Sequence, residues 1–99
     1  DMLVYSAAKA ALTLMAKSLA LQLAPDGTTV NSIAPGVILT DRNTEALSDN
    51  GYRAKALSKI PLGIFGEAKD CAGILKLLCS EDGRYITGQN IFTDGGMSL

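Results

Sequence analysis

A tyrosine and a lysine stand four residues apart near the start of the sequence, at Tyr5 and Lys9. Residues at this spacing lie on one face of an α-helix, with about 5–6 Å between their Cβ atoms. A phenol ordinarily titrates near pH ~10, and an ammonium beside a phenol favours the ionised form and lowers its pKa. On a helix the pair therefore predicts a tuned general acid, suited to protonating an oxygen that becomes an alcohol. By itself, the spacing is equally consistent with a non-catalytic pair, in which a tyrosine lies at the boundary of the core and the lysine is solvated.

The element that would hold this pair is a helix over residues 5–23. The segment is rich in Ala, Leu and Met and is followed by Pro25-Asp26-Gly27, a helix-ending sequence. Because almost all its other residues are apolar, we expect this helix to be buried on more than one side, with one face against a sheet and another against a second subunit. Its polar residues form one narrow stripe of Ser6, Lys9, Thr13 and Lys17. For Lys17 we expect only a solvated position at the helix edge.

The rest of the sequence predicts an alternation of strands and helices. The β-branched run at 28–34 predicts a strand, and residues 41–60 predict two short helices broken at 48–51. This polar segment is either a lid over a site or an ordinary surface connection. Residues 68–79 predict a helix with Cys71, Ile74, Leu75 and Leu78 on one face, and residues 90–93 a strand. Helix followed by strand is half of a parallel α/β unit.

Composition excludes several classes of function. The chain has 99 residues, 47% hydrophobic and 19% charged, with a net charge of −1. This balance is typical of a soluble domain and carries no basic stripe, so we expect neither nucleic acid nor a membrane as partner. The absence of histidine excludes Ser-His-Asp and Cys-His nucleophiles and His-ligated metals, and we expect no metal site. Cys71 and Cys79 are too far apart on one helix to bridge, which predicts reduced, buried thiols in a cytoplasmic protein.

The predicted elements do not add up to a self-sufficient sheet. Parallel sheets need both faces covered and more than two short strands. The sequence therefore predicts the C-terminal part of a larger α/β protein, with residues 1–99 as one segment of a single domain.

Taken together, four motifs resemble the C-terminal portion of the short-chain dehydrogenases/reductases. Tyr5-x-x-x-Lys9 is similar to the catalytic motif of this family, and residues 30–40 to the strand and loop that meet the nicotinamide. Residues 61–67 and 85–96 resemble its C-terminal signature. Within the family, the chain looks most like the 3-oxoacyl-acyl-carrier-protein reductases and related sugar dehydrogenases.

The resemblance implies a fold and a reaction. The fold would be part of a Rossmann-like doubly wound parallel sheet, ordered helix, strand, lid helices, helix, strand. The reaction would be hydride transfer between NAD or NADP and a small carbonyl or alcohol. Tyr5 would donate the proton, and Lys9 would tune it and bind the nicotinamide ribose. Subunits would form dimers or tetramers.

The resemblance also assigns a wall of the nicotinamide pocket. Its residues would be Pro35, Gly36, Ile38 and Thr40, with the Thr40 hydroxyl on the carboxamide. Proline fixes φ and glycine lacks a Cβ, so the backbone here can approach a flat ring closely. The alternative is a plain turn after a strand.

Other family features are missing from the sequence. A glycine-rich phosphate loop is absent, and Gly95-Gly96 has no helix after it that would bind a pyrophosphate. The family's catalytic serine would precede residue 1. We therefore expect the segment to be inactive alone and the parent enzyme to be active. The alternative is a non-catalytic interaction fragment that assembles with itself or with a separate N-terminal half.

Overall fold

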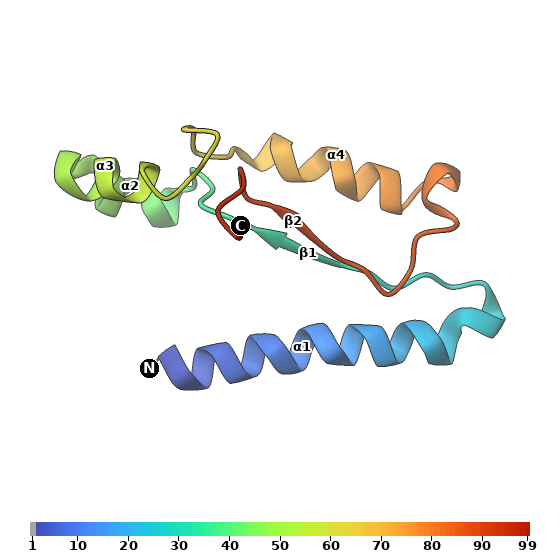
Figure 1. The fold of residues 1–99 in the computed structure, drawn as a ribbon. Helices are drawn as coiled ribbons and strands as arrows, with labels where there is room; N and C mark the ends of the chain where they lie inside the picture. Colours follow the sequence, from blue (N-terminus) through green and yellow to red (C-terminus); the bar gives the residue numbers. More distant parts are fainter. Residues whose placement is uncertain (1) are drawn as a thin grey trace. The chain divides into compact units, whose positions relative to one another are not determined.

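The computed structural model describes residues 2–99 and alternates helices with short strands (Figure 1). The α-helices are α1 (Met2–Leu23), α2 (Asp41–Ser48), α3 (Asn50–Leu57) and α4 (Ala68–Leu78). The strands are β1 (Ser32–Pro35) and β2 (Asn90–Thr93), and the 3₁₀ turns are η1 (Ala24–Asp26) and η2 (Glu81–Gly83). Each of these helices and strands matches one predicted from the sequence, with boundaries shifted by a few residues.

The chain divides into two compact units. The first comprises Asp1–Ser32 and Leu77–Ile91, and the second Ile33–Lys76 and Phe92–Leu99. Each unit contains a part of both strands and is described below by itself.

The two strands form a parallel pair. The Ser32 N–H donates to the Gln89 carbonyl at 2.8 Å, and the Gly36 N–H donates to the Thr93 carbonyl at 3.1 Å. Both strands thus advance in the same direction, which confirms the predicted parallel α/β arrangement.

The first strand is shorter than the predicted run at 28–34, because side chains replace the regular ladder before Ser32. The Val30 N–H donates to the Thr87 hydroxyl, and the Asn31 amide bonds the Ile86 carbonyl and the Gln89 N–H. Side-chain hydrogen bonds of this kind compete with strand pairing.

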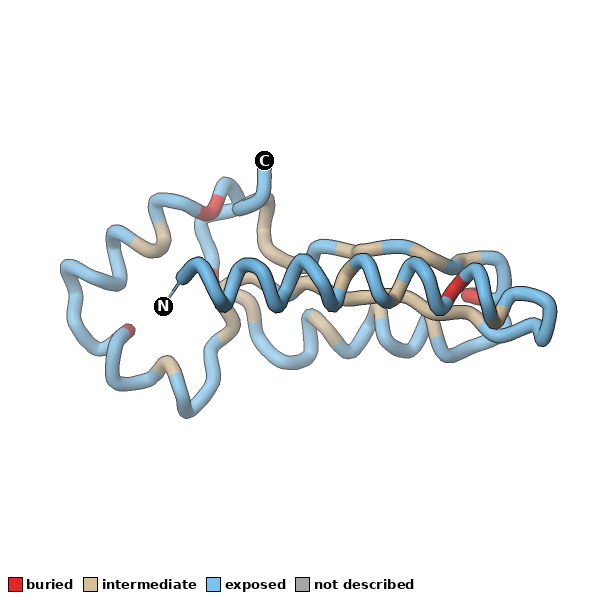
Figure 2. Tube along the Cα trace, turned by 90° about the horizontal axis from the view of Figure 1, so that it is seen from below, coloured by how far each residue is buried: buried red, intermediate tan, exposed pale blue. Residues whose placement is uncertain are grey.

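Helix α1 is exposed over most of its surface (Figure 2). Only Ala20 is buried, and Thr13, Ala16 and Leu23 on the same face are half-buried. Residues 2–99 thus cover one face of this helix, and the packing of a second face on another subunit stays a prediction. Its exposed large apolar residues are Met2, Leu3, Val4, Leu12, Leu14, Met15, Leu19 and Leu21.

The second unit has a small core made by Leu47, Ile60 and Phe65. The core joins α2 to the segment that follows α3. Asp49 separates α2 from α3. Its carboxylate caps α3 by accepting the Tyr52 N–H at 2.7 Å. This confirms the two short helices predicted over residues 41–60.

Helix α4 packs less of its predicted face than expected. Cys71, Ile74 and Leu78 are half-buried, and the Cys71 thiol lies 3.4 Å from the Thr93 hydroxyl. Leu75 is 51% exposed. The helix ends at Leu78, so Cys79 is exposed, and the prediction that both thiols are buried is wrong for this residue. Within residues 2–99, no helix has the length and hydropathy needed to cross a bilayer.

Candidate functional site

Tyr5 and Lys9 lie together on α1, as the sequence predicts. The Lys9 Nζ atom stands over the Tyr5 ring, 5.6 Å from its centroid, which is within the range of a cation–π contact. Tyr5 is 58% exposed, and its hydroxyl makes no hydrogen bond to any residue within 2–99. The phenol is therefore available to a ligand while the ammonium stays beside it.

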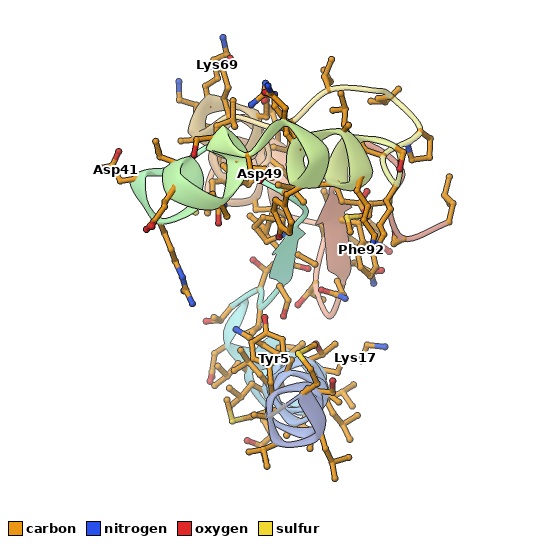
Figure 3. All side chains as sticks on the ribbon, turned by 90° about the vertical axis from the view of Figure 1, so that its left-hand side faces the viewer. Tyr5, Lys17, Asp41, Asp49, Lys69 and Phe92 are labelled. Atoms are coloured by element: carbon orange, nitrogen blue, oxygen red, sulfur yellow. The ribbon has the colours of Figure 1, made fainter. Side chains whose placement is uncertain are left out.

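The next turn of α1 makes a side-chain hydrogen bond within the helix and none to the Tyr5 hydroxyl. The Thr13 hydroxyl donates to the Lys9 carbonyl at 3.1 Å, a bond made along the helix. Lys17 projects from a different side of α1 than Tyr5 (Figure 3). This placement agrees with the solvated position expected for Lys17.

The second predicted group, residues 35–40, follows β1 directly. Pro35 and Thr40 are exposed, while Gly36 and Ile38 are half-buried. The backbone here is held from one side by Gly66, whose N–H donates to the Val37 carbonyl at 2.9 Å. Gly66 also accepts the Leu39 N–H at 2.8 Å. An isolated parallel bridge between Ile38 and Gly66 thus fixes the backbone of this segment.

Close packing against Asp94 requires a glycine at position 36. A Cβ at this position would lie 2.7 Å from both Cα and Cβ of Asp94. Such a distance forces the backbone to move, so only glycine fits between the end of β1 and the end of β2. This contact is one that the sequence interpretation, which invoked close approach to a flat ring, did not include.

Asp94 in turn organises the chain after β2. Its carboxylate accepts the N–H groups of Gly96 and Ser98, each at 2.9 Å. The Ser98 side chain, together with these N–H groups, lowers the pKa of Asp94, and partial burial opposes them. The turn is therefore held by the ionised carboxylate and loses this stabilisation as the pH falls through the lowered pKa.

Residues 41–60 contribute to the core of the second unit and also line a cavity. The Asn43 side chain donates to the Ile38 carbonyl at 2.7 Å and so ties α2 to the predicted nicotinamide wall. Leu47 belongs to the core, and Leu57 packs on it. Tyr52 of this segment is 55% exposed.

Arg53 was not singled out from the sequence, although it lines a cavity of about 400 Å³ in this segment. Its guanidinium carbon lies 4.9 Å from the centroid of the Phe65 ring. Nothing in the sequence around Arg53 marks it as special, because Phe65 reaches it only through the fold. The other residues that line the cavity are Leu39, Thr40, Asp41, Thr44, Leu47 and Ser48.

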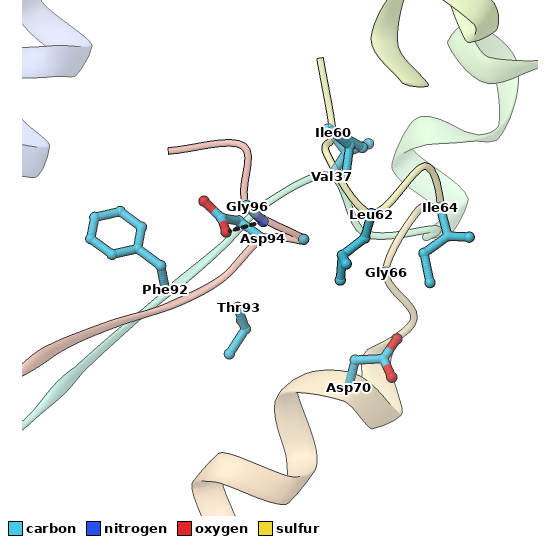
Figure 4. Close-up of a pocket in the computed structure, with 11 residues that line it drawn as sticks. Val37, Ile60, Leu62, Ile64, Gly66, Asp70, Phe92, Thr93, Asp94 and Gly96 are labelled. Atoms are coloured by element: carbon cyan, nitrogen blue, oxygen red, sulfur yellow. Dashed lines mark hydrogen bonds between the residues drawn. The ribbon is translucent and has the colours of Figure 1, made fainter. Parts of the chain in front are cut away.

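A larger cavity, of about 450 Å³, contains none of the predicted site residues (Figure 4). Its two carboxylates already have structural partners. Asp70 accepts the Glu67 N–H at 2.7 Å, and Asp94 holds the turn described above. Within residues 2–99 there is no cluster of side chains that could hold a metal ion.

The structure thus brings the predicted residues together as two groups. Tyr5 and Lys9 belong to the first unit, and Pro35, Gly36, Ile38 and Thr40 to the second.

Comparison with known proteins finds one family over almost the entire chain. The family model described as Enoyl-(Acyl carrier protein) reductase matches residues 1–98. The chain is 47% identical over 95 residues to a 3-oxoacyl-[acyl-carrier-protein] reductase of Haemophilus influenzae, covering 96% of this chain and 38% of the relative. It is 41% identical over 95 residues to glucose 1-dehydrogenase 2 of Bacillus subtilis, covering 96% of this chain and 36% of the relative.

Solved structures agree with these matches. A protein of Agrobacterium tumefaciens with bound NADP matches with a TM-score of 0.90 at 35% identity, over 95% of this chain and 38% of that one. A 4-hydroxyisoleucine dehydrogenase complexed with NADH matches with a TM-score of 0.91 at 34% identity, over 95% of this chain and 39% of that one. The chain therefore spans a little over a third of the length of its relatives.

Proposed function

This chain belongs to the short-chain dehydrogenases/reductases, a family that uses NAD or NADP, and we propose that it supplies the proton donor and the nicotinamide wall of such an enzyme. The complete protein would reduce a small carbonyl compound, or oxidise the corresponding alcohol. The single observation that carries the proposal is the Lys9 ammonium placed 5.6 Å from the centre of an exposed tyrosine ring.

In this proposal Tyr5 donates its hydroxyl proton to the carbonyl oxygen during reduction and takes it back during oxidation. Lys9 favours the ionised phenol, because an ammonium stabilises a nearby negative charge. The same ammonium would bind the nicotinamide ribose. The hydride itself comes from the bound nicotinamide cofactor.

The residues after β1 fit a nicotinamide ring. Pro35 and Thr40 are exposed at the carboxyl end of a parallel strand, where ligands bind in open α/β sheets. Thr40 precedes α2 without making a side-chain cap bond, so its hydroxyl is available to a carboxamide. Gly36 and Ile38 are held by Asp94 and Gly66, which would keep this wall rigid.

The parent protein would be cytoplasmic and would assemble as a dimer or tetramer. The row of exposed apolar side chains on α1 supports association, since an apolar patch of this extent is unusual on a free surface. The phosphate-binding loop would come from a part of the parent protein outside residues 1–99.

The test is Tyr5→Phe in the complete protein that carries this chain. The change keeps the ring and removes the transferable proton, so we expect turnover to fall by on the order of 10²-fold or more with cofactor binding retained. The matched control is Tyr85→Phe, because Tyr85 is 99% exposed. Full activity of the Tyr5→Phe protein would overturn the assignment.

A second candidate is a non-catalytic assembly fragment, which the same exposed face of α1 favours. It would be supported if the protein forms oligomers while Tyr5→Phe and wild type show the same absence of oxidoreductase activity.

A further inference from the structure

We propose that the cavity beside Arg53 binds an anionic group of the substrate, a carboxylate or a phosphate. This inference rests on the proposed function, and it specifies a chemical class that the function leaves open. The cavity measures about 400 Å³ and lies wholly within the second unit. Because Thr40 is one of its walls, it adjoins the residue assigned to the nicotinamide carboxamide.

Arg53 is held in place by an aromatic ring. Its guanidinium carbon is 4.9 Å from the centre of Phe65, and Phe65 is only 8% exposed, as a member of the small core. A guanidinium that packs its flat face on a ring keeps its N–H donors around the edge. The stack thus orients Arg53 and leaves its hydrogen-bonding edge for another group.

Within the described residues, no carboxylate forms an ion pair with Arg53. Within residues 2–99, the ion pairs are Lys69 with Glu67 and Arg84 with Glu81, and neither involves Arg53. Asp41 also lines the cavity, but its side chain projects outward from the start of α2 (Figure 3). Arg53 therefore has donors and a fixed position but no anion.

Two of the hydroxyl groups that line the cavity already donate hydrogen bonds to the backbone. Thr44 donates to the Thr40 carbonyl at 3.2 Å, and Ser48 donates to the Glu45 carbonyl. The Thr40 hydroxyl makes no cap bond to α2. Because the Thr40 hydroxyl is assigned to the nicotinamide carboxamide, an anion in the cavity would accept its hydrogen bonds from Arg53.

The charges around the cavity are nearly balanced. Residues 41–60 contain four basic residues, Arg42, Arg53, Lys55 and Lys59, and three acidic ones, Asp41, Glu45 and Asp49. Binding of an anion would therefore depend on Arg53 itself, the basic residue that lines the cavity.

The test is isothermal titration calorimetry of the complete protein with sodium acetate, with inorganic phosphate and with the neutral isostere acetamide. We expect acetate or phosphate to bind saturably in the millimolar range and acetamide not to bind. Tighter binding of acetate would identify a carboxylate substrate, and tighter binding of phosphate a phosphorylated one.

Variants locate the site. Arg53→Met should weaken anion binding by about tenfold or more, because a charged hydrogen bond is lost. Arg53→Lys keeps the charge without the planar fork and should lie between wild type and Arg53→Met. The control is Arg42→Met, a basic residue of α2 that does not line the cavity; it should bind like wild type.

Three results would overturn the inference: no saturable anion binding, equal binding of acetamide, or unchanged binding by Arg53→Met. Because the titration measures binding and not turnover, its outcome is separate from that of Tyr5→Phe. Anion binding with a fully active Tyr5→Phe protein would remove the catalytic proposal and leave the cavity, and the reverse pattern would remove only the cavity.

Discussion

At the scale of single residues, the proposed chemistry depends on the ammonium of Lys9 and its place beside the Tyr5 ring. This pair could be predicted from the sequence because both residues lie on one helix, where spacing alone fixes which side chains are neighbours. Arg53 could not be predicted, since its partner Phe65 lies beyond the end of α3 and meets it only through tertiary packing. Gly36 is intermediate: the sequence marks a special position, and the structure identifies Asp94 as the neighbour that requires it.

Replacing Lys9 tests its role directly. Lys9→Met removes the ammonium that stands 5.6 Å from the centre of the Tyr5 ring, so we expect weaker binding of NAD or NADP and slower turnover. The measurements are the cofactor Kd and kcat of the complete protein. The control is Lys17→Met, because Lys17 projects from a different side of α1 than Tyr5 (Figure 3). A Lys9→Met protein with the Kd and kcat of wild type would argue against the role of the ammonium.

At the scale of elements, the helices are better predicted than the strands. The apolar periodicity of α1 and α4 and the break at Asp49 are local signals, and each appears close to its expected position. The strand predicted over 28–34 is reduced to Ser32–Pro35, because Asn31 and Thr87 form side-chain bonds that no local pattern encodes. The apolar residues of α1 are a local signal too, but their periodicity does not show which segment or subunit covers each face.

The junction between β1 and β2 gives a prediction at this scale. Gly36→Ala places a methyl group 2.7 Å from the Asp94 backbone, so it should lower the free energy of unfolding by about 1–3 kcal/mol. The matched control is Gly73→Ala in α4, where a Cβ would meet nothing within 4 Å. Alanine is also the better helix former, so this change should raise stability by roughly 0.5–1 kcal/mol.

Urea denaturation of the two variants of the complete protein measures this difference. Equal stability of Gly36→Ala and wild type would show that the chain relaxes around the added methyl group and that the contact does not require glycine.

At the scale of the whole molecule, we propose that the chain carries part of what a nicotinamide enzyme needs. The proposed proton donor and nicotinamide wall lie within it, and the sequence has no glycine-rich loop for the pyrophosphate. The motifs alone predict the C-terminal portion of a short-chain dehydrogenase/reductase, and the chain spans 36–39% of the length of the relatives it matches.

The purified 99-residue chain should therefore show no specific binding of NADPH. Fluorescence titration of this chain beside the complete protein measures the difference, and we expect saturation only for the complete protein. Saturable micromolar affinity of the short chain would mean that its own residues suffice to hold the dinucleotide.

The pairing of the two strands has a consequence for how this protein is made. Val30 and Thr87, 57 residues apart, bond each other, and within residues 2–99 the strand Ser32–Pro35 pairs with Asn90–Thr93. While the chain emerges from the ribosome, α1 can form from contacts along its own length, whereas β1 must wait until Thr93 has left the exit tunnel. A chain that stalls before residue 90 would expose the unpaired edge of β1 together with the apolar side chains of α1. Chaperones bind exposed surfaces of this kind.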